Sequence, residues 1–130
     1  QDEGLDFDEA GEGDAHVSLT AIRALETRDE AIKVDEEDAG DLVARFSQID
    51  VRRGGDDGIQ LTEQGPGQIR GQLSALQAVG NKKYGVKVEQ WVAEDEARTQ
   101  EPRGALKTEA IRLAGNGKGN RIKAHHVSVN

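Results

Sequence analysis

The sequence predicts an α+β fold: a small mixed or antiparallel sheet with one or two helices, a C-terminal β-hairpin and an extended acidic N-terminal arm. Three observations predict it. Several short segments alternate apolar and polar residues, as half-buried strands do. Two longer segments, 38–49 and 66–79, space their apolar residues at helical intervals. Residues 1–15 hold seven acidic residues and only two large apolar ones, a composition typical of a solvated tail.

The length of 130 residues fits an acidic arm (1–15) followed by a single α+β domain (16–130). There is no cysteine, which excludes disulfides, thiolate metal sites and a cysteine nucleophile. No apolar run approaches the roughly 18 residues of a membrane-spanning helix. No signal peptide is visible, so the sequence indicates no membrane partner and leaves localisation unknown. We find no internal repeat.

In the first half of the domain we expect strands at 16–25, 31–35 and 59–62, with a turn at 54–58 before the last of them. Residues 38–49 favour a helix capped by Asp38. Its apolar stripe consists of Leu42, Val43, Phe46 and Ile49. A strand over 42–51 remains an open alternative.

The second helix is expected over 66–79. Pro66 suits the first helical position, and Gly80 stands where a C-terminal cap belongs. The stripe here consists of Ile69, Leu73, Leu76 and Val79. The remaining segments predict a strand at 84–93, a loop at 94–104, and two strands at 106–113 and 122–129 that form a long-looped hairpin. Residues 106–113 could instead form a short helix.

Charge is unevenly distributed between the two halves of the chain, whose net charge is −8. Residues 1–65 contain 19 acidic and 6 basic residues, whereas residues 66–130 contain 6 acidic and 11 basic ones. Leu5 and Phe7 could anchor the acidic arm on a neighbour, since residues two apart share one face of a strand. The basic hairpin that would accept the arm contains Arg112, Lys118, Arg121 and Lys123.

Two glycine-rich segments deserve a comparison with phosphate-binding loops. Residues 65–71 (GPGQIRG) lie between an expected strand and an expected helix, as a dinucleotide-binding turn does. Arg70 replaces the third glycine, however, so a helix start explains the segment as well. Residues 115–121 (GNGKGNR) lack the Ser or Thr that follows the lysine of a nucleotide-binding loop. They indicate a basic, solvated hairpin tip.

No catalytic, cofactor or metal site can be located by spacing. Asp6, Asp8 and Asp14 partly match a calcium loop, but Val17 stands where a bidentate glutamate is required. His125 and His126 are adjacent in an expected strand and should point to opposite faces. We therefore predict no catalytic residue, cofactor or metal.

The charge asymmetry favours a non-enzymatic structural or assembly protein that self-associates, or docks on another protein subunit, through an acidic front and a basic back. A component of a viral or other particle would fit such a role. The alternative is a small regulator that binds nucleic acid through its basic half or mimics nucleic acid with its acidic half.

Overall fold

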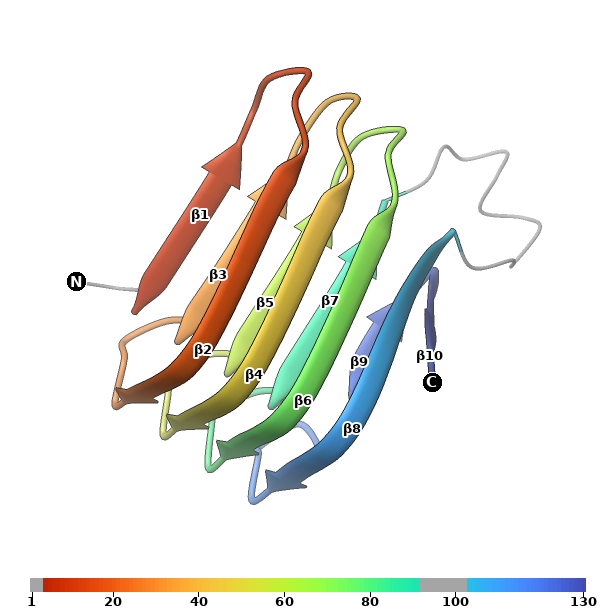
Figure 1. Ribbon diagram of the computed structural model, residues 1–130. Helices are drawn as coiled ribbons and strands as arrows, with labels where there is room; N and C mark the ends of the chain where they lie inside the picture. Colours follow the sequence, from red (N-terminus) through yellow and green to blue (C-terminus); the bar gives the residue numbers. More distant parts are fainter. Residues whose placement is uncertain (1–3, 92–102) are drawn as a thin grey trace.

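The computed structural model describes residues 4–91 and 103–130, and this part of the chain folds as a parallel β-solenoid of about four turns. All its regular elements are strands, and it contains no helix long and apolar enough to cross a membrane. The predicted α+β class is therefore wrong. The chain winds from left to right in Figure 1, so sequence order becomes position along the axis.

Two five-stranded parallel sheets face each other across the core (Figure 1). Short strands form one sheet in the order β1 (Leu5–Glu9), β3 (Ile32–Glu36), β5 (Ile59–Glu63), β7 (Val86–Gln90) and β9 (Lys123–His125). Long strands form the other in the order β2 (Ala15–Leu25), β4 (Leu42–Arg52), β6 (Ile69–Val79), β8 (Gly104–Ala114) and the short β10 (Val127–Val129). The strands expected at 16–25, 31–35, 59–62 and 106–113 are confirmed within a few residues. The strand expected at 84–93 is confirmed over Val86–Gln90, and its last two residues lie outside the described part of the chain.

A repeat of 27 residues underlies the stacking, contrary to our expectation that the sequence has none. Ile32 pairs with Ile59, and Ile59 pairs with Val86, so each turn places a similar residue over its predecessor. The repeat is visible in four aligned segments, LDFDE, IKVDE, IQLTE and VKVEQ, at the starts of successive turns. The last long strand is offset by additional chain: Asn116 bonds to Asn81 across 35 residues.

Both expected helices are strands, β4 and β6, and a backbone bend explains the error. Gln48 and Ala75, in the middle of these strands, have positive φ values of 56° and 49°. Before the bend every second residue points inward, and the bend inserts one additional residue into this alternation. The buried positions in β4 are therefore 42, 44, 46, 49 and 51. The resulting spacing of large apolar residues, i, i+4 and i+7, imitates a helical stripe.

The expected C-terminal hairpin and the N-terminal arm are also wrong. β8 and β9 belong to different sheets, and β10 pairs with β8 in parallel. Residues Leu5–Glu9 are not an extended arm but the first strand, paired in parallel with β3. Most of the loop expected at 94–104 lies outside the described residues, and Gly104 begins β8.

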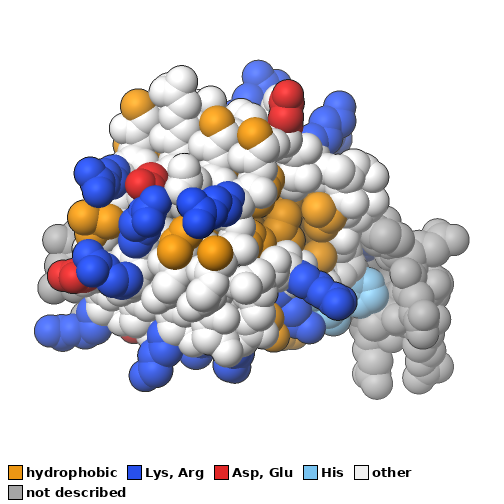
Figure 2. Space-filling model, turned by 90° about the horizontal axis from the view of Figure 1, so that it is seen from below, with side chains coloured by type: hydrophobic (Ala, Val, Ile, Leu, Met, Phe, Trp, Pro, Cys, Tyr) orange, Lys and Arg blue, Asp and Glu red, His pale blue; other side chains and the backbone are white. Residues whose placement is uncertain are grey.

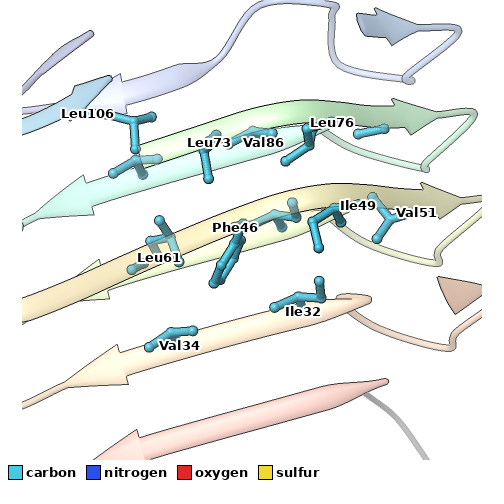
Figure 3. Packing of buried hydrophobic residues seen from close by; sticks show 14 of the residues in the cluster. Ile32, Val34, Phe46, Ile49, Val51, Leu61, Leu73, Leu76, Val86 and Leu106 are labelled. Atoms are coloured by element: carbon cyan, nitrogen blue, oxygen red, sulfur yellow. The ribbon is translucent and has the colours of Figure 1, made fainter. Parts of the chain in front are cut away.

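The core lies between the two sheets and is built mainly from Ile, Leu and Val (Figure 3). Inward-facing residues stack in columns, for example Phe7, Val34, Leu61, Val88 and Ala124. Phe46 is the largest buried side chain, with 1% of its surface exposed. Because the strands are parallel and in register, every column ends at the two ends of the solenoid.

Two buried asparagines, Asn81 and Asn116, link the turns that follow β4, β6 and β8. Asn81 accepts a hydrogen bond from the Gly54 amide (2.9 Å) and donates from Nδ2 to Asn116 Oδ1 (2.9 Å). Asn116 in turn donates to the Ala78 carbonyl (2.9 Å). Turn backbone groups that would otherwise be buried without partners are satisfied in this way.

The glycine-rich segment 65–71 covers the turn between β5 and β6 and the first residues of β6. No helix begins here, so both the helix-start and the dinucleotide-binding interpretations are wrong. The glycines of this segment allow adjacent turns to touch. A Cβ on Gly65 would overlap the Asp38 carbonyl oxygen, and one on Gly67 would overlap that of Gly40.

Candidate functional site

Charge changes sign along the solenoid axis. Within the described residues, the first turn (4–31) holds 8 acidic and 2 basic residues, and the second (32–58) holds 8 and 4. The third (59–85) holds 1 and 3, and the last part (86–91 and 103–130) holds 2 and 7. Residues 92–102, outside the description, add four acidic and one basic residue. The asymmetry between sequence halves thus becomes an acidic end and a basic end.

The acidic end is formed by β1 and β2, each of which pairs on one side only within the described chain. Leu5 and Phe7, the predicted anchors, are half-buried and pack against the core from β1. A hollow of about 500 Å³ opens between the two strands, lined by apolar residues that include Leu5, Ile22 and Leu25. Leu25 keeps 41% of its surface exposed, so the end of the core is incompletely covered.

The basic end is formed by β8, β9, β10 and the turn between β8 and β9. The structure brings the four predicted basic residues to this end: Arg112 in β8, Lys118 and Arg121 in the turn, and Lys123 in β9. All four side chains are exposed. Ile122 and Ala124 are half-buried at the end of the core, as Leu5 and Phe7 are at the acidic end.

The two predicted halves of the interaction therefore lie at opposite ends of one molecule. β1 and β9 are separated by β3, β5 and β7 (Figure 1), roughly 19 Å at about 4.8 Å per strand spacing. The first strand of a chain cannot cover the basic end of the same chain.

Arginines gather on the face formed by the turns after the long strands, where Figure 2 shows many Lys and Arg side chains. Arg23, Arg52 and Arg53 line a hollow of about 320 Å³ there. Each of them has an acidic partner, however. Arg52 Nε lies 2.7 Å from Asp50 and Arg53 lies 3.2 Å from Glu26, while Arg23 approaches Asp50 at 4.0 Å.

Two carboxylate clusters could hold a hard cation. Asp6 and Asp8 of the partial calcium motif meet Asp35 of β3, and not the other residues of that motif. The second cluster consists of Glu30, Asp56 and Asp57. Burial raises the pKa of Glu30 and of Asp57, while Lys83 Nζ contacts Asp56 at 2.7 Å. Since Asp57 also accepts the Tyr84 amide at 2.9 Å, internal partners satisfy much of this cluster.

A buried column of two carboxyl groups and one amide, which sequence reasoning missed, lies at the ends of β3, β5 and β7. Glu36 and Glu63 have no exposed surface, and Gln90 occupies the same place in the next turn. Both carboxylate oxygens of Glu36 and Oε2 of Glu63 have no hydrogen-bond partner among the described residues. Burial, followed by the adjacent Glu63 carboxyl, raises the pKa of Glu36 to about 8. The 27-residue spacing Glu9–Glu36–Glu63–Gln90 was the signal that could have revealed the column.

The three histidines do not form a common site. His16 lies 3.6 Å from Asp14 at the acidic end. At the other end, the rings of His125 and His126 touch edge to face with centroids 4.4 Å apart, so the expectation that they point to opposite faces is wrong. His126 has a φ of 54° and interrupts the strand between β9 and β10.

No protein-family model, curated protein or solved structure matches this chain.

Proposed function

We propose that this protein is an assembly module whose copies associate end to end, the acidic end of one copy against the basic end of the next. The observation that carries the proposal is the change of charge along the axis, from 8 acidic and 2 basic residues in the first described turn to 2 and 7 in the last. In the part of the chain that the structure describes, each end also presents strands with an unpaired edge, which is a template for pairing with another chain.

Charge selects this arrangement over its alternatives. Two acidic ends, or two basic ends, would repel one another, so a symmetric dimer through like ends is disfavoured. A contact between unlike ends uses two different surfaces and leaves one of each free. Such heterologous contacts continue into rings or filaments unless a cap stops them.

Light scattering after size exclusion tests the proposal. The double variant Lys118→Glu/Lys123→Glu places acidic groups at the basic end and should abolish association. The control variant Arg45→Glu/Lys82→Glu makes the same change in net charge at exposed positions of the inner turns and should leave association intact. Loss of association in both variants would show that net charge, and not the basic end, matters. Association retained in both would overturn the proposal.

Nucleic-acid binding is the second candidate, favoured by the basic face in Figure 2. The arginines that line its hollow are each paired with an acidic residue, and a phosphate would have to compete with those pairs. A salt-dependent shift of the protein in the presence of duplex DNA, lost in Lys118→Glu/Lys123→Glu, would support this function. Absence of a shift at low salt would contradict it.

A further inference from the structure

Within residues 4–91 and 103–130, β1 and β9 each have one unpaired edge, and these two edges are complementary residue by residue. On the outer face, one column runs Asp6, Lys33, Gln60, Lys87, Lys123, and another runs Asp8, Asp35, Thr62, Glu89, His125. On the inner face, the column of Phe7 ends at Ala124. A copy stacked along the axis without a register shift would therefore place Asp6 on Lys123, Phe7 on Ala124 and Asp8 on His125.

We infer that β1 of one copy adds in parallel to the free edge of β9 of the next copy, in the register that continues these columns. This inference rests on the proposed function and specifies the interface between two copies. Main-chain hydrogen bonds would extend the short-strand sheet across the two molecules. The Asp6–Lys123 contact would supply the charge complementarity, and Phe7 on Ala124 would cover both exposed ends of one core column.

The side chains of β1 discriminate against other registers. A shift by one residue would turn Phe7 outward and Asp6 or Asp8 inward, because side chains alternate between faces. A shift by two residues that brings Asp8 onto Lys123 would place Glu9 on Ala124, at the end of the core. That would bury a carboxylate without a partner, which is costly. A shift by two residues in the other direction would place Leu5 on Ala124 but Gly4 on Lys123, so the lysine would lose its acidic partner. The unshifted register keeps Phe7 on Ala124 and Asp6 on Lys123.

The long-strand sheet contributes less to this interface. β10 covers only Gly104–Leu106 of β8, so it can receive Ala15–Val17 of the incoming β2 and no more. The rest of the incoming β2 would have no strand directly beneath it. We therefore expect a reversible association that is sensitive to salt, carried mainly by β1 and β9.

Mixing two charge variants tests the Asp6–Lys123 contact. Asp6→Lys alone should be monomeric, because the introduced lysine of one copy would repel Lys123 of the next copy. Lys123→Asp alone should be monomeric for the converse reason. An equimolar mixture should associate again, because each variant restores the partner that the other has lost. Misfolding of either variant cannot produce this recovery.

Disulfide trapping tests the register, since the chain has no cysteine of its own. Strands about 4.8 Å apart place opposed residues within the Cα separation of a disulfide, about 4.4–6.8 Å. Phe7→Cys/Ala124→Cys should therefore give a ladder of covalent multimers under mild oxidation. The matched control, Glu9→Cys/Ala124→Cys, reports the register shifted by two and should not cross-link. An intramolecular bond is excluded because these strands lie at opposite ends.

The outcomes distinguish an error in the inferred β1–β9 interface from an error in the proposed function. Recovery on mixing together with selective Phe7–Ala124 trapping supports the inference. Association of the unmodified protein without recovery, or with trapping through position 9, overturns the register and leaves end-to-end assembly standing. A protein that stays monomeric at low salt overturns both.

Discussion

Replacing Glu36 by glutamine should stabilise the fold in a pH-dependent manner. Glu36 is fully buried and neither carboxylate oxygen has a hydrogen-bond partner among the described residues. One turn beyond Glu63, Gln90 shows how an amide fits the same position: its Oε1 accepts the Ile69 amide at 3.0 Å and its Nε2 donates to the Gly67 carbonyl. The equivalent carbonyl for residue 36 is that of Gly13, which lies with Glu36 Oε1 beside Gly40.

The magnitude follows from proton linkage. The pKa of Glu36 is raised to about 8 in the folded protein, from 4.5. Below pH 4.5 the side chain is protonated in both states, so its ionisation takes nothing from the stability. As pH rises towards 8, the unfolded chain ionises while the folded one must keep its proton, and stability falls by about 1.4 kcal/mol per pH unit. The loss reaches about 3 kcal/mol at pH 7 and about 5 kcal/mol above pH 8, and Glu36→Gln removes it.

Urea unfolding followed by circular dichroism between about pH 5 and pH 9 measures this effect. High salt should be used so that association does not add to stability. The difference between Glu36→Gln and the unmodified protein should grow with pH. Glu37→Gln, at an exposed neighbouring position, is the control and should show no such trend, whereas Gln90→Glu should introduce a similar pH dependence. A constant difference across the range would refute the reasoning.

Three further substitutions test the packing. Asn81→Ala should lower the free energy of unfolding by about 1–3 kcal/mol, because it leaves the buried Gly54 amide without a partner and removes the side-chain bond to Asn116; urea unfolding measures it. Phe46→Ala should cost about 3–5 kcal/mol by opening a cavity between the sheets, in the same assay. Gly65→Ala should lower the melting temperature because its Cβ would overlap the Asp38 carbonyl, whereas Gly13→Ala meets nothing within 4 Å and should not. Equal melting temperatures for the two glycine variants would contradict the close stacking of the turns.

Much of the strand content could be predicted from alternation, but the fold could not. β3 and β7 alternate strictly, and β2 alternates up to its own bend at Ala21, so the sequence displays a period of two there directly. In β6, the bend at Ala75 puts Leu73 and Leu76 on the same side, three residues apart, where alternation would put them on opposite sides. Pro66 and Gly80 flank this strand as turn residues and imitate helix ends. Local pattern alone therefore favoured a helix.

The missed repeat explains the remaining errors. Its 27-residue period is carried by similarity of type, as between Ile32 and Ile59, and seldom by identity, and extra chain interrupts it before β8. Without the period, β8 and β9 looked like a hairpin and residues 5–9 like a tail. The charge asymmetry could be predicted because counting charged residues along the sequence requires no knowledge of the fold. That the asymmetry separates two ends of the molecule follows only from the direction of the solenoid axis. That Glu36 and Glu63 form a buried column follows only from the register of the strands.

Light scattering of the unmodified protein at two salt concentrations tests the central claim most directly. At about 0.01 M salt, where charges act over about 30 Å, we predict a molar mass well above that of one chain and rising with protein concentration. At about 1 M salt, where screening limits them to about 3 Å, the mass should fall towards 14.0 kDa. A mass of one chain under both conditions would contradict the account.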